Sequence, residues 1–269
     1  MNYEALYLEK IGHVTIVTLN RPDKLNALNR QLAQEFHMAL DEVAAEFPDT
    51  RVLIVTGAGR GFCSGADVGY QAERLAMPQD QEPQQQDTEA AFADSILALG
   101  PHIPRIPQPV IAAINGVAAG AGLSIALASD IRVASDKARF SCIFINRSLV
   151  PDNGCSYFLP ALAGMGVAAE MALTGRIYDA QWALQAGLVN QVVAADQLME
   201  QATALAEEIA SNPPLAVRAT KQLLNSHVPD LHQVARLERD ANAPSRDSED
   251  RREAILSFLE KRQPVYRGR

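Results

Sequence analysis

One stretch of the chain, residues 52–69, constrains the fold more than any other; its sequence is VLIVTGAGRGFCSGADVG. It begins with the apolar and β-branched run 52–56, which predicts a strand buried on both faces. The run ends in closely spaced glycines and then in the small segment 64–67, Ser-Gly-Ala-Asp. Small residues at the end of a strand let a ligand approach the backbone and leave amide N–H groups available to donate. We therefore expect a buried strand that carries main-chain donors to a binding site.

A second stretch, residues 110–128, repeats this plan further along the chain. It holds a predicted strand at 110–114, a turn of small residues at 115–122 (NGVAAGAG) and the start of a helix at 123–128. Two such turns can aim two N–H groups at one oxygen atom, which is the arrangement of an oxyanion hole. Turns between a strand and a helix are also common where an α/β protein binds nothing, so each turn alone also has a purely structural interpretation.

The remaining pattern predicts strands first, then strand–helix units, then helices. Asn29 precedes a helix with one apolar face, and His37 falls outside that face, so we expect His37 at the surface. The other predicted elements are, in order, a hairpin at 3–10 and 13–19, a helix at 92–99, an extended connector at 101–109, strands at 131–134 and 138–141, helices at 155–162, 167–173 and 181–186, a strand at 188–193, a helix capped by Asp196 and ending near 210, a helix opened by Pro213 and Pro214, and a charged helical segment from 230 to about 260.

The composition limits the possible partners. With a net charge of −8 and an isoelectric point near 5.2, we expect no nucleic acid and no anionic membrane as partner. No apolar run of membrane-spanning length is evident, and the first residues do not predict a signal peptide. Cys63, Cys142 and Cys155 show neither metal-binding spacing nor a disulfide framework, so we expect no metal and a cytoplasmic protein. Cys63 lies in the first turn, where it is a reactive thiol or, as we favour, a small buried residue.

Six segments together resemble the crotonase, or enoyl-CoA hydratase/isomerase, superfamily. They are 20–28 (NRPDKLNAL), 62–67 (FCSGAD), 115–122 (NGVAAGAG), 128–131 (ASDI), 149–152 (LVPD) and 258–262 (FLEKR). The resemblance covers nearly the whole chain and implies an α/β fold, with a crotonase-like spiral of ββα units over 1–200 and a C-terminal helical trimerisation region at 201–269. It implies a homotrimer or a dimer of trimers. It also implies an acyl-CoA thioester as partner and substrate, with coenzyme A as part of that substrate and no separate cofactor.

Matching the two turns to the family places the two oxyanion-hole donors on the N–H groups of Ala66 and Ala121. The enoyl-CoA hydratases of the family also carry two glutamates, and these positions fall on Ser124 and Phe144. Serine is a poor base at neutral pH and phenylalanine cannot move a proton, so the resemblance does not imply hydration by two glutamates. One carboxylate remains, Asp152, which is a candidate acid/base or, in a structural interpretation, the N-cap of the next helix.

Ser124, Phe144 and Asp152 together look like the enoyl-CoA isomerases of phenylacetate degradation, which use the aspartate as the base. We therefore expect an acyl-CoA isomerase that shifts a double bond through an enolate held in the oxyanion hole. One alternative is an enoyl-CoA hydratase with an unusual substrate, and another is a CoA-binding protein without catalysis. A dehalogenase of the 4-chlorobenzoyl-CoA type is less favoured, because those enzymes carry a tryptophan where this chain has Phe144.

The resemblance also implies where the rest of the substrate binds. Besides Ser124 and Phe144, the expected contacts are Lys24, Leu25 and Ala27 at the adenine end, Ser64, Gly65 and Asp67 along the pantetheine, and Phe258 and Lys261 on the C-terminal helix, often that of a neighbouring subunit. Asp67 is otherwise a residue that caps its loop, and the basic pair Lys261 and Arg262 is otherwise a solvated helix face. The polar segment 78–88 is either a surface insertion or, as the resemblance implies, a lid over the acyl pocket.

Overall fold

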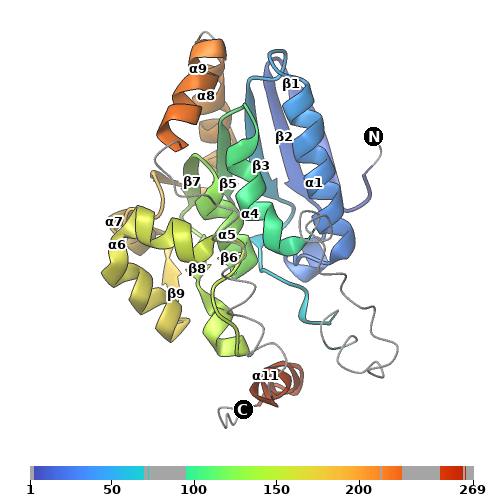
Figure 1. The fold of residues 1–269 in the computed structure, drawn as a ribbon, viewed down its shortest axis with the longest axis vertical. Coiled ribbons are helices and arrows are strands. Elements are labelled where there is room, and N and C mark those ends of the chain that lie inside the picture. Colours follow the sequence, from blue (N-terminus) through green and yellow to red (C-terminus); the bar gives the residue numbers. More distant parts are fainter. Residues whose placement is uncertain are drawn as a thin grey trace.

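The computed structural model describes residues 3–69, 72, 95–212, 214–225, 249–262 and 264 (Figure 1). Its strands form two sheets. The larger sheet has six strands in the order β1-β2-β3-β5-β7-β10, and the smaller sheet has four in the order β4-β6-β8-β9. The lid proposed for 78–88 and most of the charged segment from 230 to 260 lie outside the described residues.

The strands of the larger sheet are β1 (Leu6–Ile11), β2 (Val14–Leu19), β3 (Val52–Gly57), β5 (Val110–Ile114), β7 (Ile131–Ser135) and β10 (Gln191–Val193), and those of the smaller sheet are β4 (Gly61–Cys63), β6 (Val117–Ala119), β8 (Arg139–Ser141) and β9 (Ile177–Asp179). The helices are α1 (Arg30–Ala45), α4 (Leu99–His102), α5 (Ala121–Ala128), α6 (Cys155–Thr174), α7 (Ala180–Gln185), α8 (Leu198–Ala210), α9 (Pro214–Asn225) and α11 (Glu249–Leu259). Short 3-10 helices are η1 (Pro22–Lys24), η2 (Ile96–Ala98), η3 (Ile103–Arg105), η4 (Ile143–Arg147) and η5 (Ala195–Gln197).

The predicted buried strand, β3, runs through the middle of the larger sheet. It pairs in parallel with β2 on one side and with β5 on the other. Every residue of β3 and β5 is buried, as expected for parallel strands that are covered on both faces. Leu53 and Val55 belong to the same core as α1, whereas Val52 and Ile54 belong to the core under α8. The C-terminal end of β3, from which the chain continues through β4 to the first glycine turn, is therefore held between two packed layers.

The smaller sheet is built by a repeat. Each of β4, β6 and β8 follows directly on β3, β5 and β7 in the chain, and these three strands pair in parallel with one another. Helix α5 follows β6, and η4 and α6 follow β8. This repetition of two strands and a helix is the ββα spiral that the resemblance implied, and it confirms the α/β fold. Because β4, β6 and β8 span three residues each, they are too short to give an alternation pattern in the sequence.

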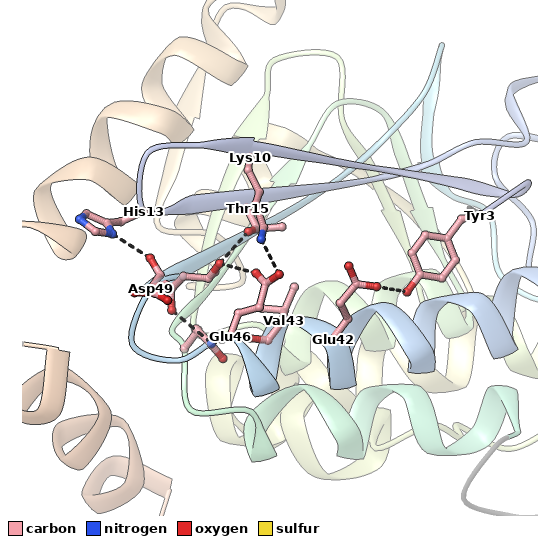
Figure 2. Close-up of polar contacts among 10 residues, drawn as sticks. Tyr3, Lys10, His13, Thr15, Glu42, Val43, Glu46 and Asp49 are labelled. Atoms are coloured by element: carbon pink, nitrogen blue, oxygen red, sulfur yellow. Dashed lines mark hydrogen bonds and ion pairs between the residues drawn. The ribbon is translucent and has the colours of Figure 1, made fainter. Parts of the chain in front are cut away.

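The N-terminal hairpin is fastened to α1 by polar contacts (Figure 2). Tyr3 Oη donates to Glu42 Oε2 at 2.8 Å, and the Lys10 ammonium pairs with Glu46. Thr50 Oγ1 also donates to Glu46, at 2.7 Å. These contacts hold the outer, antiparallel edge of the sheet against α1.

Two predicted helix caps have different outcomes. Asn29 caps α1 as predicted, because Leu32 N donates to Asn29 Oδ1 at 2.9 Å. The cap predicted at Asp196 is wrong. Asp196 lies in η5, and the N-cap of α8 is Gln197, whose side chain makes no capping hydrogen bond.

The prediction that His37 lies at the surface is wrong. His37 is only 5% exposed. Its Nδ1 lies 2.8 Å from His102 Nδ1, and its Nε2 lies 3.0 Å from Ser95 O. His102 Nε2 in turn lies 3.1 Å from Asp41 Oδ1. Burial and the neighbouring His37 lower the pKa of His102, while Asp41 acts in the opposite direction. The two histidines join α1 to α4 and so belong to the core.

The prediction of an extended connector at 101–109 is also wrong at the start of that segment. Residues 99–105 form α4 and η3, with Pro101 and Pro104 both in first-turn positions where a missing N–H costs little. The strand predicted at 188–193 is shorter and covers only β10. The two helices predicted at 155–162 and 167–173 are the two halves of α6, separated by Gly164 with φ 77° and ψ 161°.

Helix α6 corrects the expectation that no apolar stretch reaches membrane-spanning length. It is 20 residues long, and within the described residues it is the one helix apolar enough to cross a membrane by length and composition. Its backbone is interrupted at Gly164, however, and Pro160 lies inside it. Leu159 and Met171 of α6 are buried in the core, whereas Leu173 is 73% exposed, so this helix is apolar on its outer face as well as on its core face.

Candidate active site

The two glycine turns that the sequence singled out meet in the structure. The first follows β4 and holds Gly65, whose φ is +93°; the second follows β6 and holds Gly120, whose φ is +53°. A Cβ added to Gly65 would lie 2.8 Å from Ala119 O and 3.4 Å from Ala121 N. The turns are therefore in direct contact, and at Gly65 both the positive φ and the space exclude a side chain.

Each turn presents one N–H group at this contact. Leu28 pairs with Ala66 in a parallel bridge; its N donates to Gly65 O at 2.8 Å, and its O accepts from Asp67 N at 2.9 Å. That pairing leaves the N–H of Ala66 out of the ladder. Ala121 is the first residue of α5, so its N–H has no partner within the helix. No acceptor for either N–H lies among the described residues. Two adjacent donors, each from a different turn, are what an oxyanion hole requires.

The loop that carries Asp152 is fastened to the second turn through its main chain. Ser124 Oγ, fully buried on α5, lies 3.1 Å from Asp152 O and 3.2 Å from Gly120 O, where its hydrogen donates to one or is shared by both. Asp152 is partly buried. The N-cap residue of α6 is Gly154, so Asp152 does not occupy the N-cap position that the structural interpretation gave it.

Asn153 is a buried residue of this loop that the sequence did not single out. Its Oδ1 accepts from Gly100 N at 2.6 Å, and its Nδ2 lies 3.4 Å from Ala121 O. A Cβ on Gly100 would lie 2.1 Å from Asn153 O, so α4 can approach only because Gly100 has no side chain. Asn153 adopts a φ of 56°, which asparagine tolerates better than most residues. The Asp-Asn-Gly sequence gave a turn signal, but the bonds to α4 and α5 could not be inferred from it.

Substitution of Ser124 tests how much its hydrogen bond to Asp152 O contributes to catalysis. We expect Ser124→Ala to lower kcat about fivefold, because a lost hydrogen bond of about 1 kcal/mol loosens the Asp152 loop. Ser129→Ala is the matched control: Ser129 is also buried, and its Oγ donates to Ile125 O at 3.1 Å within the same segment, away from Asp152. Urea unfolding should show similar stability losses for both variants, with kcat reduced only for Ser124→Ala. Equal kcat values in the two variants would contradict the positioning role.

Phe144 lies beside the second turn. It is 5% exposed, and its ring lies 3.9 Å from the position of a Cβ on Gly120. The Ile143 side chain is 3.6 Å from the same point. Both residues belong to η4, so the position where the resemblance expects a glutamate carries an apolar wall instead. Trp182, the only tryptophan in the chain, stacks on Tyr178 with ring centroids 3.8 Å apart.

The segment expected at the adenine end of coenzyme A lies against the first turn. Ser64 N donates to Leu25 O at 3.0 Å, and Ser64 Oγ donates to Lys24 O at 3.2 Å. Leu25 has a φ of 50°, Ala27 is buried, and Lys24 is exposed. The structure therefore brings Lys24, Leu25 and Ala27 together with Ser64 and Gly65.

Asp67 has a structural role at this point. Its Oδ2 accepts from Arg21 Nη2 at 2.8 Å, and its Oδ1 accepts from Gly69 N at 3.0 Å. Arg21 also donates to Ala27 O. The Arg21–Asp67 pair thus ties the predicted adenine segment to the chain that follows Ala66, which agrees with the interpretation of Asp67 as a residue that holds its loop.

Helix α11 covers η4 and brings the C-terminal motif towards the site. The Arg147 guanidinium lies over the Phe258 ring, 4.2 Å from its centroid. Lys261 is exposed just beyond the helix. Arg251 Nη1 donates to Arg147 O at 3.0 Å and is buried. The sequence interpretation missed Arg251, although its spacing of three, four and seven residues from Ala254, Ile255 and Phe258 puts it on their face of the helix.

The cysteines take no part in this chemistry. Cys63 is fully buried, and burial raises its pKa to about 12, so it carries no thiolate near neutral pH. Cys142 and Cys155 are buried with their sulfur atoms 3.8 Å apart. Among the residues that the structure describes, no group of three or more histidine, cysteine or acidic side chains could hold a metal ion.

Known proteins similar to this chain agree with the geometry. The family model described as enoyl-CoA hydratase/isomerase matches residues 9–269. A 1,2-epoxyphenylacetyl-CoA isomerase of Escherichia coli (strain K12) is 36% identical over 271 residues and covers 100% of both chains. A short-chain-enoyl-CoA hydratase of Clostridium acetobutylicum is 35% identical over 266 residues, covering 97% of each. A solved structure of an enoyl-CoA hydratase from Mycobacterium avium subsp. paratuberculosis K-10 has a TM-score of 0.86 and 31% identity, covering 99% of this chain and 100% of the other. The chain is an enzyme that belongs to the enoyl-CoA hydratase/isomerase family.

Proposed function

We propose that this enzyme is an acyl-CoA isomerase that shifts a double bond in an enoyl-CoA thioester. One observation carries the proposal: a single carboxylate, Asp152, sits on a loop fastened to the oxyanion turn, while Ser124 and Phe144 occupy the two positions where the resemblance expects glutamates. One carboxylate is enough to remove a proton and return it to another carbon. The similarity to the 1,2-epoxyphenylacetyl-CoA isomerase supports this class of reaction.

The proposed mechanism follows from the charges that develop. When Asp152 removes a proton from the acyl chain, negative charge moves onto the thioester oxygen. The N–H groups of Ala66 and Ala121 donate to that oxygen, and each donor lowers the barrier by roughly 2.7–4 kcal/mol. Asp152, now protonated, returns the proton at the far end of the conjugated system. The apolar wall at Phe144 keeps water away from the enolate, which favours proton return over hydration.

Hydration is the second candidate, because similar proteins include a short-chain-enoyl-CoA hydratase. It would need a group that positions water besides Asp152. Ser124 is fully buried, and its hydroxyl faces the carbonyl oxygens of Gly120 and Asp152, so its geometry supports a positioning role rather than water activation. Because the chain is an enzyme of this family, the alternative of a CoA-binding protein without catalysis falls away.

The deciding experiment offers 3-enoyl-CoA and 2-enoyl-CoA thioesters of several acyl groups to the enzyme in ¹⁸O-labelled water. We expect the 3-enoyl substrates to convert to the conjugated 2-enoyl form with no ¹⁸O in the product, and to exchange a carbon-bound proton in deuterated water. Incorporation of ¹⁸O into a 3-hydroxyacyl product, without any shift of the double bond, would replace the isomerase proposal by the hydratase.

We also propose that the enzyme binds its acyl-CoA through Lys24, Leu25, Ala27, Ser64, Gly65 and Phe144, with Phe258 and Lys261 at the CoA end, and that it assembles as a homotrimer or a dimer of trimers. Exposed apolar side chains support assembly: they gather on α6 and on β9, which follows it (Met165 73%, Leu173 73% and Ile177 70% exposed). An apolar surface of this kind on a folded chain marks an interface.

We expect Leu173→Glu to break the assembly, since a charge in an apolar interface loses its hydration without a partner. Light scattering should report a trimer or hexamer for the unmodified chain and smaller species for Leu173→Glu. Leu215→Glu is the control, because Leu215 is 70% exposed but lies on α9. A monomeric and fully active unmodified protein would sink the assembly proposal.

A further inference from the structure

Arg251 is an arginine in an unusual place. It is only 6% exposed, and arginine is almost never this buried unless its charge is balanced. It lies on α11 beside the buried Ala254 and Ile255, and its Nη1 donates to Arg147 O at 3.0 Å. A hydrogen bond to a neutral carbonyl orients the guanidinium but does not neutralise it, so its charge must be met by an anion nearby.

The anion that acts on Arg251 is Asp152. Burial lowers the pKa of Arg251 to about 10; the charge of Asp152 raises it, and that of Arg147 lowers it. Arg251 therefore remains cationic near neutral pH. Glu253, two residues further along α11, has a cationic partner of its own, since Arg262 Nη2 donates to Glu253 Oε2 at 2.8 Å. An electrostatic interaction is mutual, so the charge of Arg251 favours the ionised form of Asp152 as much as Asp152 favours that of Arg251.

We propose that Arg251 is a positioning residue for the reaction: its buried guanidinium, carried by the last described helix, holds the Asp152 carboxylate ionised and ready to accept a proton. The proposal rests on the proposed function, in which Asp152 moves that proton. In this proposal α11 has a second role in the site. Besides presenting Phe258 and Lys261, the helix supplies the positive charge beside the base, so the acid/base group is complete only when α11 is docked on η4.

A purely structural role is the competing interpretation, because Arg251 also links α11 to η4 through Arg147 O. The two roles differ in what they do to the proton affinity at position 152. A structural link alone changes stability and the amount of folded enzyme. A nearby positive charge also lowers the pKa of whatever acid stands at position 152, typically by 1–3 units when the charges are within about 4–6 Å.

The test measures the proton affinity at position 152 without depending on the isomerase reaction. In an Asp152→Cys background, the rate of alkylation by iodoacetamide as a function of pH gives the pKa of the introduced thiol. The three native thiols are fully buried. The unsubstituted protein, which contains only these thiols, gives the background rate of alkylation. We expect Arg251→Met to raise the pKa of the introduced thiol by about 1 unit, at the low end of the usual range because Arg147 still contributes positive charge. Arg251→Lys should restore most of the shift.

Arg252→Met is the matched control, since Arg252 is the next residue on the same helix and is exposed; it should leave the thiol pKa unchanged. In the enzyme with Asp152 intact, Arg251→Met should move the acidic limb of the kcat/KM profile to higher pH by the same amount. Equal thiol pKa values in Arg251→Met and Arg252→Met would overturn the proposal. Failure of the proposed function is a separate result: the thiol pKa would still respond to Arg251, but the unsubstituted enzyme would not shift the double bond.

Discussion

Asp152→Asn should lower kcat for the double-bond shift about 10³-fold and leave KM nearly unchanged. General acid–base catalysis contributes roughly 10²–10⁴-fold, and an amide cannot accept the proton. KM should hold because asparagine has the shape of aspartate and because the hydrogen bonds from Ser124 Oγ to Asp152 O and from Gly100 N to Asn153 Oδ1 remain in the variant. Steady-state kinetics with a 3-enoyl-CoA substrate, together with deuterium exchange at the substrate carbon, measure the effect.

Asp196→Asn is the appropriate control for this variant. Asp196 is exposed in η5 and caps no helix, so the same change of carboxylate to amide should leave both kcat and stability as they were. An Asp152→Asn enzyme that isomerises at the rate of the unsubstituted protein would show that another group moves the proton.

Gly65→Ala should be nearly as damaging, although it removes no reactive group. The added Cβ would lie 2.8 Å from Ala119 O, and the backbone at this position has a φ of +93°. The two turns must then move apart, which separates the donors of Ala66 and Ala121. Loss of one oxyanion-hole donor costs about 10²–10³-fold in kcat, and we expect a loss of that size here.

Gly12→Ala is the control that separates the effect of backbone strain from the effect of pushing the two turns apart. Gly12 also has a positive φ, +59°, but a Cβ there meets no atom within 4 Å. It should therefore cost only the strain of about 1–2 kcal/mol in stability, without an effect on kcat. Parallel urea unfolding and kinetics of both variants check this. If Gly65→Ala keeps the kcat of the unsubstituted enzyme, the two turns do not form the oxyanion hole.

The parts of the fold that could be predicted are those with a local signal. β3 and β5 are continuous apolar runs, α1 has an apolar face preceded by Asn29, and both glycine turns are short stretches of small residues. Their positions follow from neighbours in the chain. The resemblance then supplied the pairing of the Ala66 and Ala121 donors and the candidate role of Asp152 as acid/base, which no periodicity contains.

The parts that could not be predicted depend on distant packing. His37 is polar by type and buried because His102, far along the chain, lies against it. Arg251 is a charged residue in a charged segment, and only the docking of α11 on η4 places it beside Arg147 and under the influence of Asp152. The outward apolar face of α6 escaped notice because the same composition is typical of a buried helix.

The contact between the two turns has a consequence for how such an enzyme changes its reaction. Both donors proposed for the thioester oxygen are peptide N–H groups, and the Ser124 bond to the loop ends on a peptide oxygen, so every amino acid except proline offers the same atoms at these points. Substitution at 144 or 152 can therefore change the side chains that face the acyl group, while the main-chain donors for the enolate oxygen stay in place. The main chain would then lower the barrier that these reactions share, and the side chains at 144 and 152 would decide the product.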